Sequence, residues 1–181
     1  TYAKELELYQ KEFPDLEVNL VMGNHEEHLT RYLREARYAQ DIVSNHYLAL
    51  DLTKDMLDGK NPIEEWTLKH YPHLRKNVKW LDSSASIKVD NITMSVHGHK
   101  GHSGSRGSLT GMEVSYGKSN TGHSHSAAIL RDSFVAGCMC VMKMPYTEGS
   151  SSKWTHSNVV NYSNGKRAVL NSFKGKWKID R

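Results

Sequence analysis

The chain has 181 residues, of which 38% are hydrophobic and 24% are charged. This composition supports a globular core and argues against intrinsic disorder, and the length fits one compact domain or part of a larger one. No apolar stretch is long enough for a membrane-spanning helix, no signal peptide is recognisable, and no membrane partner is expected. The formal net charge of +4 weakly favours polyanionic partners such as nucleic acid, although ordinary solubility charge explains it equally well.

The first 22 residues predict a helix followed by a strand. Apolar side chains recur at three- and four-residue spacing over residues 2–13, as they do on one face of a helix, and Pro14 ends this pattern. Residues 16–22 are mostly apolar, which predicts a strand in the interior of a sheet.

The next stretch predicts helices and an insertion. Glu26 is expected to begin a second helix, because Glu26 and Glu27 in a first turn suit the positive end of the helix dipole. The inward face of this helix is predicted to consist of Leu29, Leu33 and Ala36. Residues 48–80 are expected to form a helical or irregular insertion with an aromatic patch.

The sequence from residue 86 onward predicts mostly strands. Residues 86–96 are typical of a hairpin that turns at residues 90–91, and residues 100–111 are rich in Gly and Ser and predict a loop. Two further strands are expected on either side of residues 131–132. The Asn-Gly pair at residues 164–165 predicts the last hairpin, because this dipeptide is a strong turn signal.

Two cysteines, Cys138 and Cys140, are separated by one residue. In a strand this spacing would place both side chains on one face. It is not a zinc-knuckle spacing, and a bridge between such close residues would restrain little of the chain. Buried free thiols in a reducing compartment such as the cytoplasm are therefore expected.

Polar and metal-binding side chains follow three of the predicted strands. Functional groups gather at the carboxyl ends of strands in open α/β sheets, and glycine lets the backbone approach a metal or a phosphate closely. Neutral imidazole suits zinc, iron, manganese or nickel, whereas amide oxygens suit harder ions. The repeated pattern favours a divalent metal site over isolated solvated histidines. Its members are Asn24, His25, His97, His99, His123 and His125.

The last two of these histidines lie in one short motif, GHSH, at residues 122–125. A regular strand would point the side chains of His123 and His125 in the same direction. A bent loop is therefore expected here, if the two imidazoles are to bind different ions.

The motifs GNHE, HG and GHSH follow one another in the order that is typical of the calcineurin-like metallophosphoesterase superfamily, which this chain resembles. They occupy residues 23–26, 97–98 and 122–125. The resemblance covers about three quarters of the chain between residues 16 and 177, and the C-terminal stretch looks most like phage-encoded members described as nucleases. It implies an α/β (α+β) fold, with a two-layer β-sandwich flanked by helices and with the N-terminal strands missing.

The resemblance also implies a role for each matching residue. Asn24, His97 and His123 would bind the second of two divalent metal ions, and His125 would bind the first. Mn²⁺ is the expected ion, with Fe, Zn, Ni or Mg as alternatives. The two ions would clamp the phosphate and provide a metal-bound hydroxide for in-line attack. His25 would contact the attacked phosphate and help to protonate the leaving oxygen.

Two earlier motifs of the superfamily, DxH and GDxxD, do not occur in this sequence. They supply the bridging aspartate and the remaining ligands of the first metal. Residues 1–181 would therefore form the C-terminal part of a single metallophosphoesterase domain, and the missing N-terminal half that carries DxH and GDxxD would be its partner. Whether that half is cleaved, lies on another chain or is simply not included stays open.

Basic and hydroxyl side chains follow the second strand end in the stretch KGHSGSRGS. His99, His102 and Arg106 are candidates for binding the substrate, because such side chains contact phosphate oxygens. A flexible surface loop is the alternative interpretation. The basic residues near the C-terminus, Arg167 among them, are expected on a solvated face, and Trp154 is expected to be buried rather than to stack on a base.

The predicted function is a metal-dependent phosphodiesterase, a DNA nuclease, that acts in the cytoplasm of the host cell if a phage encodes it. One alternative is a phosphomonoesterase or protein phosphatase of the same fold, and another is a non-catalytic binding module with half a site. DNA, RNA and small phosphoesters all stay open as substrates, as do endonuclease and exonuclease action. The oligomeric state, including a homo-oligomer, is equally open.

Overall fold

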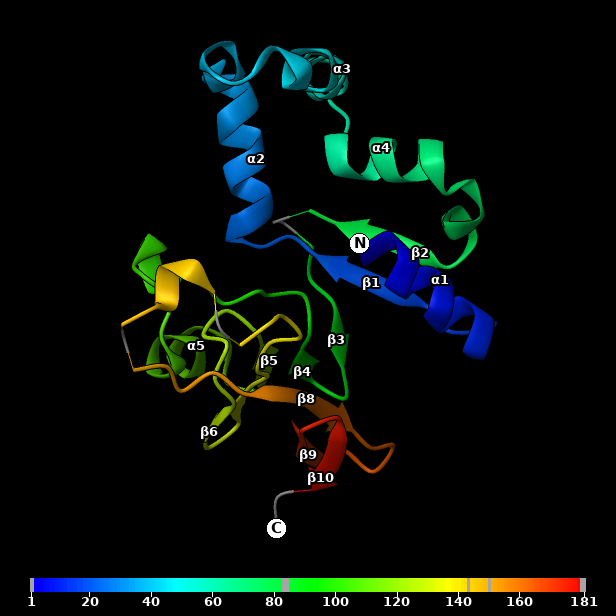
Figure 1. Ribbon diagram of the computed structural model, residues 1–181. Coiled ribbons are helices and arrows are strands. Elements are labelled where there is room, and N and C mark those ends of the chain that lie inside the picture. Colours follow the sequence, from blue (N-terminus) through cyan, green and yellow to red (C-terminus); the bar gives the residue numbers. More distant parts are fainter. Residues whose placement is uncertain (1, 83–84, 143, 150, 180–181) are drawn as a thin grey trace. The chain divides into compact units, whose positions relative to one another are not determined.

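The structure is a computed structural model that describes residues 2–82, 85–142, 144–149 and 151–179. The chain forms two compact units, an N-terminal unit of residues 1–83 and a C-terminal unit of residues 84–181, each of which is described by itself (Figure 1). Both units combine helices with strands, so the protein is a mixed α/β protein, consistent with the α+β class. In the described ranges no helix has both the length and the apolar character that crossing a bilayer requires.

The N-terminal unit holds a two-stranded parallel sheet and most of the helices of the chain (Figure 1). Its elements are α1 (Tyr2–Glu12), β1 (Val18–Val21), α2 (Asn24–Arg34), η1 (Arg37–Gln40), η2 (Val43–Asn45), α3 (His46–Leu57), α4 (Pro62–His70), η3 (Pro72–Lys76) and β2 (Val78–Leu81). The predicted first helix and the strand that follows it are thus confirmed, with boundaries one or two residues shorter.

Two apolar clusters form the core of this unit. The first joins the buried face of α1 to α4, η3 and β2 through Ala3, Leu6, Leu68, Leu74 and Val78. The second joins α2 to α3 through Leu33, Ala49 and Leu52. The segment predicted as an insertion, residues 48–80, therefore supplies side chains to both clusters.

Two details of the N-terminal unit differ from the predictions. Among the described strands, β1 pairs only with β2, in register Val18 with Val78, so β1 is not an interior strand. Ala36 is exposed rather than inward, because α2 ends at Arg34 and Ala36 takes a left-handed conformation with a φ of 50°. Helical periodicity cannot be extended beyond the residue where the helix ends.

The C-terminal unit is built on two sheets. A five-stranded sheet has the order β3-β4-β5-β7-β6, in which β4, β5 and β7 are parallel, and a three-stranded antiparallel sheet has the order β10-β9-β8. The elements are β3 (Lys88–Val89), β4 (Ile92–Thr93), η4 (His102–Gly104), α5 (Leu109–Tyr116), β5 (Ser119–Thr121), β6 (Ala128–Leu130), β7 (Ser133–Val135), η5 (Pro145–Thr147), β8 (His156–Asn161), β9 (Arg167–Phe173) and β10 (Lys176–Ile179).

The predicted hairpins are present in this unit. Asp90 and Asn91 both have a positive φ, of 50° and 65°, which is the conformation of a two-residue type I′ turn. Gly165, with a φ of 76°, lies in the turn between β8 and β9. A third turn at residues 174–175 adds β10, a strand that was not predicted.

The two sheets of the C-terminal unit are joined by Arg167, whose side chain is only 5% exposed. Its guanidinium donates hydrogen bonds to the Ser119 carbonyl (3.1 Å), to Asn120 Oδ1 (3.1 Å) and to the Asp132 carbonyl (2.8 Å). It also lies over the ring of Phe134, 4.0 Å from the centroid. Burial lowers the pKa of this guanidinium, and the nearby carboxylate of Asp132 opposes that shift. The expectation that Arg167 lies on a solvated face is therefore wrong.

Cys138 and Cys140 follow β7 and lie outside any regular strand, so their placement on the face of a strand is not confirmed. Both thiols are free, as expected, with Cys138 buried and Cys140 half-buried. Burial raises the pKa of the Cys138 thiol, and a hydrogen bond with the Cys140 thiol raises it further.

Cys138 is therefore expected to react more slowly with iodoacetamide than Cys140, because the thiolate is the reactive form and a raised pKa reduces its population at any given pH. The rate at Cys138 should keep rising with pH beyond the point where an ordinary thiol is fully ionised. Mass spectrometry of the peptide that contains both residues measures the two rates. In urea the rates should become equal, and a faster reaction at Cys138 in the folded protein would contradict the prediction.

Candidate functional site

In the N-terminal unit, the GNHE motif forms the start of α2. The helix begins at Asn24, and Gly23 at its N-cap has an extended backbone (φ −113°, ψ −176°) that any residue can adopt. The carboxylate of Glu26 accepts a hydrogen bond from the Gly23 N–H at 2.9 Å, which stabilises a helix start. The helix thus starts two residues before the predicted start at Glu26. Glu26 lies in its first turn, as expected for a dipole partner, and it also caps the Gly23 N–H.

His25 lies in this first turn of α2. Its ring stacks with the ring of His28, one turn further along the helix, with centroids 5.9 Å apart and an angle of 20° between the planes. Asn24 and His25 are the first two residues of α2. Both lie at the positive end of the helix dipole, a place that favours an anionic ligand such as a phosphate.

In the C-terminal unit, three imidazoles come together in the loops that follow β4 and β5. The ring centroid of His97 lies 5.4 Å from that of His99 and 5.3 Å from that of His123, and His99 and His123 are 6.0 Å apart. The carbonyl of His97 accepts hydrogen bonds from the N–H groups of Gly122 (3.0 Å) and His123 (3.1 Å). The two predicted strand ends are therefore tied to each other by their own backbones.

Two glycines allow this close approach. Gly98 has a φ of 100°, and a Cβ added there would lie 2.9 Å from the Cβ of Thr121. Gly107 donates its N–H to the carbonyl of His99 (2.9 Å), and a Cβ at Gly107 would lie 1.8 Å from the carbonyl oxygen of Gly98. The HGH motif is held in place by the returning end of the loop that follows it.

Gly107→Ala is expected to destabilise the protein by about 3 kcal/mol or more, because the new Cβ meets rigid backbone rather than the end of a flexible side chain. Urea unfolding monitored by circular dichroism measures this loss. The matched control is Gly104→Ala in the same loop, where a Cβ meets nothing within 4 Å and only the positive φ of 78° is unfavourable, at a cost of about 1 kcal/mol. Equal losses for the two variants would show that the contact of Gly107 with Gly98 is unimportant.

His125 lies at a bend in GHSH and contacts a different aromatic ring. It has a positive φ of 59°, and its ring meets the ring of Trp154 edge to face, with centroids 4.5 Å apart and an angle of 83°. The N–H of Thr155 donates to the carbonyl of His125 at 3.0 Å. The expected bend is therefore present, and His123 and His125 have different surroundings. Trp154 is half-buried, and its contact with His125 could not be recognised from the sequence.

The loop of residues 100–107 holds the remaining candidates for substrate binding. His102 and Arg106 are exposed, whereas His99 belongs to the imidazole cluster. Lys100 and Arg106 form a β-bridge, and the Gly101 N–H donates to the Ser105 carbonyl at 2.7 Å. This loop is therefore folded on itself, and it carries two exposed side chains that can donate hydrogen bonds, those of His102 and Arg106.

The spacing of the three imidazoles is close to that of metal ligands, but it does not form a metal site as it stands. With metal–nitrogen distances of about 2.0–2.1 Å, the ring centres of imidazoles that share one tetrahedral ion lie about 5.2 Å apart. The centroid of His97 lies 5.4 Å from that of His99 and 5.3 Å from that of His123, whereas His99 and His123 are 6.0 Å apart. Across the part of the chain that the structure describes, no group of three or more His, Cys, Asp or Glu side chains is arranged to hold a metal ion. Binding would therefore require rotation of these rings about their side-chain torsions.

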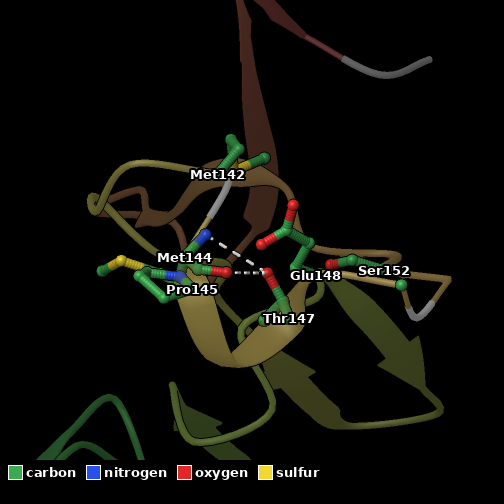
Figure 2. Close-up of a pocket in the computed structure, with 7 residues that line it drawn as sticks. Met142, Met144, Pro145, Thr147, Glu148 and Ser152 are labelled. Carbon is green, nitrogen blue, oxygen red and sulfur yellow. Dashed lines mark hydrogen bonds between the residues drawn. The ribbon is translucent and has the colours of Figure 1, made fainter.

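A pocket of about 570 Å³ lies in the C-terminal unit, in the segment between β7 and β8 (Figure 2). Thr147 closes one side of it, donating its hydroxyl hydrogen to the carbonyl of Met144 at 2.9 Å. The pocket is lined by Met142, Met144, Pro145, Thr147, Glu148, Gly149 and Ser152. None of the predicted site residues is among them, so this pocket and the imidazole cluster are built from different residues.

The fold and the site define a mixed α/β protein with an imidazole cluster in the loops after two parallel strands. No protein-family model matches the chain, and no solved structure matches it. The chain is 30% identical over 182 residues to Protein A1 of Escherichia phage T5, in an alignment that covers 97% of this chain and 32% of that protein. The chain is thus similar to a phage protein, and it spans about a third of the length of this curated relative.

Proposed function

We propose that this chain is part of a metal-dependent phosphodiesterase that cleaves DNA. The observation that supports the proposal most directly is the cluster of His97, His99 and His123, which lies in the loops after parallel strands with ring centroids 5.3 to 6.0 Å apart. Its motifs occur in the order that is typical of calcineurin-like metallophosphoesterases, whose two-layer fold is part of the proposal.

Most of the proposed site residues would bind metal ions, and one would transfer a proton. In the C-terminal unit, His97 and His123 would hold one divalent ion and His125 would contribute to a second, with Mn²⁺ as the expected ion. Asn24, in the N-terminal unit, is a candidate ligand by its motif alone. Two such ions supply Lewis acidity and a nucleophile at neutral pH. His25, in the first turn of α2, would donate a proton to the leaving oxygen.

DNA is favoured as the substrate by exposed groups of the C-terminal unit. Arg106 and His102, in the loop that follows His99, are exposed and available for phosphate contacts. On the three-stranded sheet, Phe173 and Trp177 are 67% and 50% exposed, and the ammonium of Lys174 lies 5.5 Å from the centre of the Phe173 ring. Exposed aromatic rings next to lysines can stack on unpaired bases.

The similarity to a phage protein supports the proposal that the enzyme is phage-encoded and acts in the host cytoplasm. Because the chain spans about a third of that relative, the DxH and GDxxD motifs would be contributed by another part of a longer protein. The activity proposed here is therefore that of the complete site.

Hydrolysis of plasmid DNA, RNA and p-nitrophenyl phosphate in the presence of Mn²⁺ tests the proposal. It is measured for this chain and for a longer protein that also carries DxH and GDxxD. Cleavage of DNA by the longer protein is the expected result. Activity on p-nitrophenyl phosphate alone would indicate a phosphomonoesterase, and Mn²⁺ binding without any hydrolysis would indicate a binding module.

A further inference from the structure

Two thiols lie side by side in the segment that follows β7. Cys138 is buried and Cys140 is half-buried, whereas Met139 between them is 61% exposed. Although the segment is not a regular strand, this alternation places both sulfurs on the inner side of the backbone. The two thiols form a hydrogen bond with each other, so the sulfur atoms are neighbours in the folded chain.

Hydrogen bonds to residues 155–156, where β8 begins, hold this segment on both sides of Met139. The N–H of Cys138 donates to the carbonyl of Thr155 at 2.9 Å. The carbonyl of Cys140 accepts a hydrogen bond from Nε2 of His156 at 2.7 Å. The fold has therefore already restricted the backbone that a bond between the two sulfurs would have to restrict.

A disulfide at this place would be easily reversed. A disulfide stabilises a fold mainly by restricting the unfolded chain, and a bridge across one intervening residue restricts it far less than a bridge across a long loop. Disulfides that gain little from the fold are open to reduction by glutathione, and those that form in reducing compartments are usually transient. The pair of free thiols is therefore the resting form of this segment.

We propose that Cys138 and Cys140 form a reversible oxidation site that reacts with low-molecular-weight disulfides such as oxidised glutathione. The thiolate of Cys140 attacks one sulfur of oxidised glutathione, the S–S bond of that molecule breaks, and one glutathione thiolate leaves. The thiolate of Cys138 then attacks the sulfur of Cys140, and the second glutathione thiolate leaves. Two protein thiols are oxidised to one disulfide, one glutathione disulfide is reduced, and the two protons pass to the released thiols.

Burial sets the order of the two attacks. Cys138 is 8% exposed, so a tripeptide disulfide reaches Cys140 more readily. Burial also raises the pKa of the Cys138 thiol, which reduces the population of its thiolate at neutral pH. The second step joins two groups that are already in contact, and such a step is fast even for a weakly ionised thiol.

Intact-mass measurement of the folded chain, equilibrated with oxidised and reduced glutathione and quenched with acid, tests the proposal. The wild-type chain should lose the mass of two hydrogen atoms without keeping a glutathione adduct, and excess reduced glutathione should restore the original mass. Cys138→Ser should stop at one adduct, on Cys140. Cys140→Ser, the matched control of identical composition, should stay unmodified. Circular dichroism checks that both variants are folded.

Unfolding in urea separates the contribution of the fold from mere proximity in the sequence. At a fixed concentration of reduced glutathione, the folded wild-type chain should need about tenfold less oxidised glutathione to form the bridge than the unfolded chain needs. An equal requirement in both states overturns the proposal, and so does a wild-type chain that accumulates adducts without forming the bridge. Equal adducts on the two serine variants overturn the order of attack.

Discussion

His97→Ala is expected to weaken Mn²⁺ binding by at least about 100-fold and to abolish metal-dependent hydrolysis by the complete enzyme. His97 is the member of the cluster closest to both of the others, at 5.4 Å from His99 and 5.3 Å from His123. Loss of groups that merely orient ligands costs about 10–100-fold in metal affinity, and loss of a ligand itself should cost more. Isothermal titration of the chain with Mn²⁺ measures the binding.

The matched control for this experiment is His73→Ala in η3. His73 is an exposed imidazole, whereas His97 is half-buried. Its Nε2 lies 2.9 Å from a carboxylate oxygen of Glu7 in α1, and it belongs to no strand end. This variant should bind Mn²⁺ as the wild type does. If His97→Ala and His73→Ala bound Mn²⁺ equally well, or if DNA cleavage survived in His97→Ala, the assignment of the metal ligands would be wrong.

Arg167→Ala is expected to destabilise the chain by about 2–4 kcal/mol, because it leaves several hydrogen-bond acceptors inside the protein without their donor. The guanidinium contacts two backbone carbonyls and Asn120 Oδ1, and it covers the ring of Phe134. Arg167→Lys should recover only part of the loss, since an ammonium cannot reproduce the planar fork of donors. Urea unfolding measures both variants.

The control for Arg167 is Arg131→Ala in the same unit. Arg131 pairs with Glu113 at 2.9 Å, but its side chain is 78% exposed, so the change should cost no more than about 0.5 kcal/mol. Both variants remove one arginine and one ion pair. A difference between their losses of unfolding free energy therefore reports the burial of Arg167 and not the loss of charge. A similar small effect for both would mean that Arg167 does not join the two sheets.

Features governed by local chemistry were predictable from the sequence. The turn at residues 90–91 and the turn at Gly165 form where Asp, Asn and Gly accept a positive φ at little cost. The bend in GHSH was expected if its two histidines bind different ions. It occurs at His125, which has a positive φ. The capping role of Glu26 likewise depends only on residues three positions apart.

The composition of the imidazole cluster was predictable only in part. The sequence grouped His97 and His123 as ligands and assigned His99 to the substrate. The structure places the His99 ring 5.4 Å from the His97 ring and 6.0 Å from the His123 ring, compared with 5.3 Å between His97 and His123. The contacts of Gly98 with Thr121 and of Gly107 with Gly98 produce this arrangement, and no local pattern predicts contacts between loops.

By itself, the sequence determined the hairpin turns and the motifs that carry the candidate chemistry, because these depend on residues a few positions apart. Only the tertiary structure decided which side chains are buried. Arg167 is buried because β5 and the turn before β7 supply its acceptors. On α3, the apolar side chains of Ala49 and Leu52 are buried against Leu33, whereas those of Tyr47 and Leu57 are exposed. Periodicity identifies an apolar face, but burial depends on which other segment of the chain lies against it.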